Sequence, residues 1–163
     1  MTSPVAWDTT LVSRLHPGGP ALASVEAGAR AGHPVGVPAP VLTEVTFGLA
    51  RAAARDARFG AQLSWLEGLV HGPEVRVLPF DRDAGLLAGR LRALGPHPGG
   101  TGRRDPRAKP ERRVAWVLDL QIAATAWVAG CDLATENRSD FARIADLLVE
   151  IGLERLGIRD APF

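Results

Sequence analysis

The chain has 163 residues, of which 46% are hydrophobic, and its formal net charge at pH 7 is +1. This length suits one domain of roughly 100–200 residues with a single buried core. No run approaches the roughly 18 apolar residues of a membrane span. The start, MTSPVAWDTT, lacks the layout of a secretory signal, so we expect a soluble, cytoplasmic protein. A single cysteine, Cys131, excludes an intramolecular disulfide, and no CxxC or HExxH spacing occurs, so any metal should prefer oxygen ligands.

Apolar periodicity and the residues that interrupt it predict short strands alternating with longer helices. Before residue 95 we expect a strand over 5–7, a short helix over 9–15, a helix over 20–31, a strand over 33–38, a helix opened by Pro40, a helix over 56–70, a strand over 74–80, and a helix over 84–94 with Asp81 as its N-cap. Residues 95–110 hold four of the 13 prolines and four glycines, which predicts a loop. After this loop we expect a helix over 114–128, a strand over 131–135, a short helix over 139–147 and a last strand near 154–158. The alternation predicts an α/β fold with a mainly parallel sheet of four to five strands, whose ligand sites lie beyond the carboxyl ends of the strands.

Three carboxylates lie where an ionised group is costly or where a strand ends. Asp119 lies within VAWVLDLQIAATAW and Glu44 within PAPVLTEVTFGLA, and neither has a base one helical turn away. A buried, unpaired carboxylate is relieved by neutralisation, by a distant arginine or by a metal ion. Asp8 follows the first strand, where capping of the next helix is an equally open role. Converging carboxylates would suit a hard divalent cation and phosphoryl transfer.

The motifs WDTT, VLTEVTFGL, DLQIAATA and CDLATENRSDF, in this order, resemble the PIN-domain ribonucleases of the VapC-toxin kind. The resemblance covers residues 1–163 and implies a single domain with the three-layer PIN-like fold. It implies a metal-dependent endoribonuclease in which Asp8, Glu44 and Asp119 hold Mg²⁺, or Mn²⁺ in its place, and in which water attacks the phosphorus of RNA. Similarity to these toxins further implies a homodimer and a small antitoxin partner.

The closing motif departs from the family pattern, because Asn137 stands at the fourth acidic position. Asp140 either supplies the missing charge or caps the short helix that follows, and both roles stay open. Fewer carboxylates should hold fewer ions, so we expect one firmly bound Mg²⁺ and a second recruited by the RNA phosphate. Thr135 lies within the closing motif, two residues before Asn137, and is expected to support the site. Glu136 replaces the basic residue often found after it and is expected to be solvated.

Two threonines follow Asp8, and we expect the hydroxyl of one of them, Thr9 or Thr10, to bond the Asp8 carboxylate or a metal-bound water.

A Pro/Gly-rich basic insert at about 95–113 makes the chain longer than compact members of the family. Between 103 and 113, six bases face two acids, for a local charge of +4 against −3 elsewhere. These bases either grip RNA phosphates near the site or belong to a solvated loop. The candidate RNA-binding residues are Arg103, Arg104, Arg107, Arg112 and Arg113.

Three other functions stay open. An RNA-processing PIN nuclease without an antitoxin differs from a toxin in its neighbouring reading frame. A catalytically silent PIN-like binding module is supported by Asn137 in place of an acid. A flavodoxin-like phosphoryl acceptor would need a lysine near the strand ends, where the sequence has none.

Overall fold

The computed structural model describes residues 3–98 and 109–163. Within these residues the elements follow one another as β1 (Val5–Trp7), α1 (Thr9–Val12), α2 (Pro20–Arg30), β2 (Val35–Pro38), α3 (Ala39–Ala53), α4 (Ala57–Val70), β3 (Val75–Leu78), α5 (Arg82–Leu94), α6 (Lys109–Val128), β4 (Asp132–Ala134), α7 (Arg138–Glu150) and β5 (Ile158–Arg159). None of these helices is long and apolar enough to cross a membrane.

The strands form one parallel five-stranded sheet in the order β3-β2-β1-β4-β5. Ala6 of the central strand is in register with Gly36 of β2 and Leu133 of β4. The chain extends the sheet from β1 in one direction through β2 and β3, and in the other through β4 and β5. This reversal makes a switch point between β1 and β4, and open α/β sheets bind their ligands beyond the carboxyl ends of the strands at such a point. We call this region the crevice. The predicted α/β fold with a mainly parallel sheet is confirmed.

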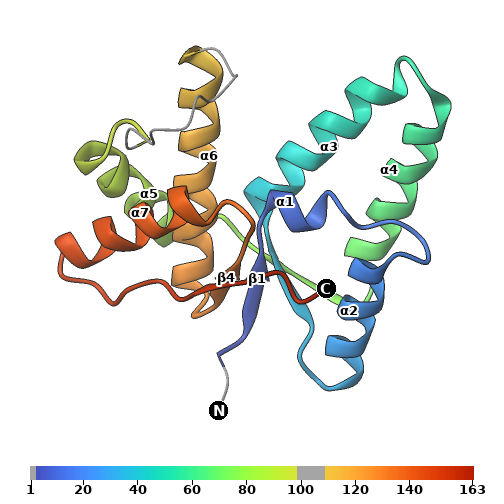
Figure 1. The fold of residues 1–163 in the computed structure, drawn as a ribbon, viewed down its shortest axis with the longest axis horizontal. Helices are drawn as coiled ribbons and strands as arrows, with labels where there is room; N and C mark the ends of the chain where they lie inside the picture. The colour runs from blue at the N-terminus through green and yellow to red at the C-terminus, as the bar shows by residue number, and fades with distance from the viewer. Residues whose placement is uncertain (1–2, 99–108) are drawn as a thin grey trace.

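Helices cover both faces of the sheet and give three layers (Figure 1). Helices α1 to α4 lie on one side, with α3 packed against α4, and α5, α6 and α7 pack together on the other. Buried aliphatic and aromatic side chains fill the space between, among them Trp7, Trp116 and Phe141.

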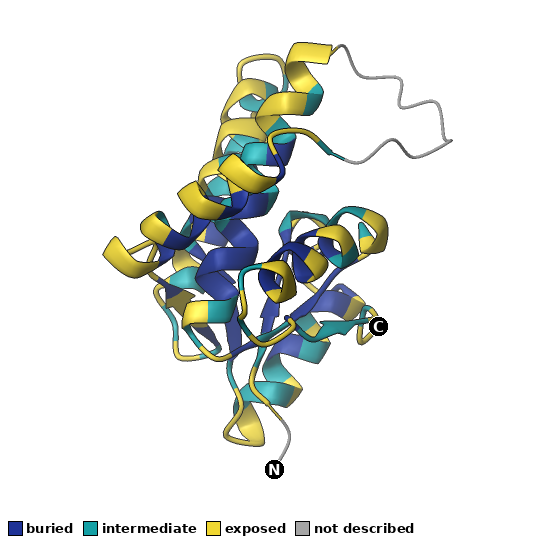
Figure 2. Ribbon diagram, turned by 90° about the vertical axis from the view of Figure 1, so that its left-hand side faces the viewer, coloured by how far each residue is buried: buried dark blue, intermediate teal, exposed yellow. Residues whose placement is uncertain are grey.

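Helix α6 begins at Lys109, five residues before the predicted start at Val114. Its first turns are largely exposed, whereas its second half is buried (Figure 2). Pro110 and Glu111 suit a helix start, because proline needs no amide donor there and an acid is favoured by the helix dipole. A helical turn exposed to solvent needs no periodic apolar residues, so the sequence pattern predicted only the part of α6 that packs against the core.

The other limits follow the predictions closely. Asp81 is the N-cap of α5, and its Oδ1 accepts from the amides of Asp83 and Ala84 at 3.0 Å. The last strand is shorter and later than expected, at Ile158–Arg159, because its pairing with β4 begins where the Leu133 amide donates to Gly157 O.

Candidate metal-binding active site

Asp8 is a buried carboxylate at the end of the central strand, with 2% of its surface exposed. Its Oδ1 accepts from the Thr10 hydroxyl at 2.6 Å and from the Leu11 amide at 3.2 Å. Its Oδ2 accepts from the Thr135 hydroxyl at 2.6 Å. Burial raises the pKa of Asp8, and these hydrogen bonds partly oppose the rise because they favour the ionised form. Asp8 therefore caps α1 and ties this turn to Thr135, the residue that follows β4.

Thr135 and Asn137 connect Asp8 to two further acids. The buried Thr135 hydroxyl, which donates to Asp8, accepts from the Asn137 amide at 2.8 Å. The Asn137 side chain then donates from Nδ2 to Asp140 Oδ2 at 3.1 Å and to Asp119 Oδ2 at 3.4 Å. Carboxylates from β1, α6 and α7 are thus gathered around two polar side chains that follow β4.

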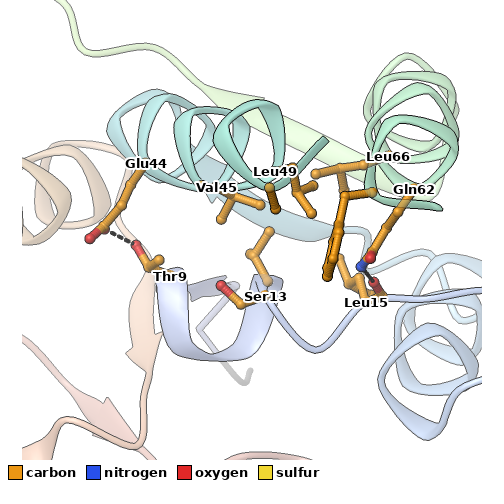
Figure 3. Close-up of a pocket in the computed structure, with 12 residues that line it drawn as sticks. Thr9, Ser13, Leu15, Glu44, Val45, Leu49, Gln62 and Leu66 are labelled. Atoms are coloured by element: carbon orange, nitrogen blue, oxygen red, sulfur yellow. Dashed lines mark hydrogen bonds between the residues drawn. The ribbon is translucent and has the colours of Figure 1, made fainter. Parts of the chain in front are cut away.

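Glu44 contacts Thr9, the residue that follows Asp8 in the chain. It is half-buried on α3, and its Oε2 accepts from the Thr9 hydroxyl at 2.6 Å (Figure 3). The Thr10 hydroxyl bonds the Asp8 carboxylate, as expected for one of the two threonines, whereas Thr9 bonds Glu44 instead. The apolar neighbours of Glu44 along α3 had singled it out, but its partner lies 35 residues earlier in the chain.

The donor set suits a hard divalent cation in its chemistry. Its charged groups are carboxylates, whose oxygens Mg²⁺ prefers, and Mg²⁺ commonly takes one or two carboxylates while keeping several waters. Within 3–98 and 109–163, no three Asp, Glu, His or Cys side chains stand close enough to ligate one ion as they lie. Instead the side-chain amide of Asn137 donates from Nδ2 to both Asp119 and Asp140, so a group of positive partial charge already bridges these two acids.

The remaining candidate residues are Asp140 at the start of α7 and the basic residues of the insert. Asn137, not Asp140, is the N-cap residue of α7, and no side chain caps this helix. Arg112 lies seven residues before Asp119 on α6, which puts it on the same face, about 10 Å nearer the helix start. Arg113 lies in the same exposed part of α6. The other basic candidates, Arg103, Arg104 and Arg107, lie outside the described residues.

Sequence reasoning missed one charged pair at the rim. Arg14, just after α1, forms a salt bridge with Glu136 at 2.8 Å. Glu136 is exposed, as expected, but it is paired rather than simply solvated. The two residues are 122 positions apart, and no local pattern links them.

An apolar groove runs away from the acids between α1, α3 and α4 (Figure 3). Glu44 and Thr9 lie at one end, and Val45, Leu49 and Leu66 line its middle. At the far end the Gln62 side chain donates to Leu15 O at 3.4 Å. The volume of the groove is about 350 Å³.

Comparison with known proteins identifies the family. The model of the PIN domain matches residues 5–147, so the chain belongs to the PIN domain family. No curated protein matches the sequence significantly.

Solved structures share the fold at low sequence identity. VapBC2 of Rickettsia felis, bound to a DNA fragment from its promoter, matches with a TM-score of 0.63 and 18% identity over 96% of this chain and 98% of that chain. DNA-bound VapBC of Salmonella typhimurium gives 0.60 and 20% over 98% of both chains. FitAcB of Neisseria gonorrhoeae gives 0.55 and 20% over 94% and 95%. The expected PIN-like fold is confirmed.

Replacing Thr135 by valine should destabilise the protein by about 1–3 kcal/mol, because a buried carboxylate oxygen and the partly buried backbone amide of Asn137 both lose their partner. Thr135→Ser is the matched control, since it keeps the hydroxyl and loses one methyl group. Urea unfolding measures both variants. Equal stability of the two would show that the hydroxyl does not hold Asp8.

Asp8→Asn should become more stable relative to the wild type as the pH rises. Because burial raises the pKa of Asp8 in the folded protein, protonation favours folding below the ordinary pKa, and this contribution is lost as the pH climbs through the raised value. The Asp8→Asn variant does not lose this contribution, because asparagine does not titrate. Thermal unfolding from about pH 4 to pH 7 without divalent ions measures the difference in melting temperature. A variant that becomes less stable relative to the wild type as the pH rises would contradict this account.

Proposed function

We propose that this PIN-domain protein is a metal-dependent endoribonuclease and acts as the toxin of a toxin–antitoxin pair. The observation that carries the proposal is the hydrogen-bonded network that gathers Asp8, Asp119 and Asp140 at the carboxyl ends of β1 and β4. Glu44 faces this network from α3 through Thr9. Acids assembled at such a point of a parallel sheet support a phosphoryl-transfer role.

Asp8, Glu44 and Asp119 are the residues that would hold Mg²⁺, or Mn²⁺ in its place. A divalent cation bound there would lower the pKa of a coordinated water and offset charge on the phosphodiester. Asp140 would complete the acidic set and, through Asn137, help to fix the orientation of Asp119. Attack of water at phosphorus, in line with the leaving oxygen, gives a 5′-phosphate and a 3′-hydroxyl.

The supporting residues fix the acids before substrate arrives. Asp8 is held on both carboxylate oxygens, so its orientation costs little further ordering when a ligand binds. Thr9 restrains Glu44 in the same way. Residues that orient ligands typically contribute about 10–100-fold to metal affinity or activity. We assign this role to Thr9, Thr135 and Asn137.

The substrate class is expected to be RNA that is single-stranded or looped at the cleavage point, since splayed bases are what proteins read in RNA. Arg112 and Arg113 lie toward the start of the helix that carries Asp119, so they support phosphate contacts along this side of the crevice. Arg103, Arg104 and Arg107 stay candidates from the sequence alone.

The antitoxin is proposed to occupy the apolar groove beside Glu44. Apolar side chains along α3 and α4 suit a segment with an apolar face, and the acids at one end favour a basic side chain entering the site. The complexes of VapBC2 and VapBC support a partner of this kind. The homodimer rests on the family resemblance and the cytoplasmic location on the sequence pattern, and both stay predictions. A short upstream reading frame for a DNA-binding protein would distinguish a toxin from an RNA-processing nuclease without antitoxin.

A silent PIN-like RNA-binding module is the second candidate. It is favoured by one observation, the Asn137 amide that bridges Asp119 and Asp140 where an ion-binding set would need an acceptor. Titration with Mn²⁺ separates the two functions, because the silent module should bind no ion at the crevice.

The nuclease should cleave single-stranded RNA with Mg²⁺ or Mn²⁺ and lose this activity in EDTA. Asp8→Asn and Asp119→Asn should each lower the rate by at least about 100-fold with folding intact, because each removes an oxygen ligand of the ion. Glu150→Gln, an exposed acid at the far end of α7, is the control that should keep full activity. Gel assays of end-labelled RNA measure the rates, and sequencing of RNA ends gives the target. Unchanged activity in either aspartate variant would rule the proposal out.

A further inference from the structure

Arg14 lies next to the carboxylate network, although no sequence motif pointed to it. Its guanidinium Nη2 lies 2.8 Å from both carboxylate oxygens of Glu136. Glu136 stands between Thr135 and Asn137, and its amide donates to the Thr10 hydroxyl at 3.3 Å. That hydroxyl donates to Asp8, so Glu136 touches the network through its backbone and holds Arg14 through its side chain.

The Arg14 guanidinium uses only part of its N–H donors on Glu136. Its contacts with Glu136 use one nitrogen, Nη2, and a guanidinium offers five N–H donors in a planar fork. The Arg14 side chain is 56% exposed and that of Glu136 is 43% exposed. An exposed ion pair is weak, so an incoming anion can share the guanidinium with Glu136 or replace it. Glu136 therefore orients Arg14 without sequestering it.

The crevice needs such a base because its own charge repels the substrate. Asp8, Asp119 and Asp140 are acids, and an RNA strand brings a negative phosphate at every nucleotide. A cation at the acids would neutralise the phosphate that reacts, but not its neighbours along the strand. The planar guanidinium matches two phosphate oxygens at once. Arg138, the next base after Glu136, is paired with Asp160.

We propose that Arg14 is a phosphate-positioning residue that binds an RNA backbone phosphate next to the scissile one, and that Glu136 holds its guanidinium at the rim. This inference rests on the proposed ribonuclease function and deepens it. Such a contact positions the strand and carries no base preference.

The test compares the cleavage kinetics of single-stranded RNA at several salt concentrations. Arg14→Gln should raise KM about 10-fold with kcat changed less than about twofold, because ground-state binding is lost rather than chemistry. The slope of log kcat/KM against log salt should become shallower by about 0.7, the value for one phosphate contact on a single strand. Arg14→Lys should keep most of the slope, because it keeps the charge.

Arg155→Gln is the matched control. Arg155 is 54% exposed and is paired with Asp146, as Arg14 is with Glu136, but this pair lies between α7 and the segment before β5. Its replacement should leave both KM and the salt slope unchanged. An unchanged slope in Arg14→Gln, or an equal loss in Arg155→Gln, would overturn the role of Arg14 while leaving the nuclease intact. A wild type that cleaves no RNA would overturn both proposals.

Discussion

The structure depends on one buried charge, the Asp8 carboxylate at the end of the central strand. An ionised group there is costly unless donors surround it, and the donors come from two places in the chain. Thr10 and the Leu11 amide belong to the turn that starts α1, and Thr135 follows β4. Satisfying Asp8 therefore fixes the carboxyl ends of β1 and β4 relative to each other. The same Thr135 hydroxyl accepts from the backbone amide of Asn137 and so fixes the residues just before α7.

This arrangement explains why the acids are close without touching a common point. Asn137 separates Asp119 from Asp140 and donates to both, which lowers their mutual repulsion in the free protein. A cation that displaced the amide would relieve the same repulsion more strongly. Titratable groups perturbed by burial cluster at functional sites, and Asp8 is such a group beside a crevice. The burial that makes the Asp8 carboxylate costly thus coincides with the position of the candidate site.

Local sequence patterns predicted the alternation of elements, because packed helices and strands impose their period on apolar residues. They failed where packing is absent, as in the exposed first turns of α6. Asp119 and Glu44 stood out because an ionised carboxylate among apolar helical neighbours is costly without a partner. Their contacts were not predictable, since Thr9 and Glu44 are 35 residues apart and Arg14 and Glu136 are 122 apart. Pairings over such distances depend on how the sheet is ordered, which no local period encodes.

The central claim is that the network around Asp8 builds a divalent-cation site. Diffraction at a wavelength that reveals Mn²⁺, from crystals soaked in Mn²⁺, tests it most directly. We expect an anomalous peak in the crevice beside Asp8 and Asp119, and no peak there in Asp8→Asn crystals. A peak elsewhere, or an empty crevice in the wild type beside a fully ordered network, would contradict the account.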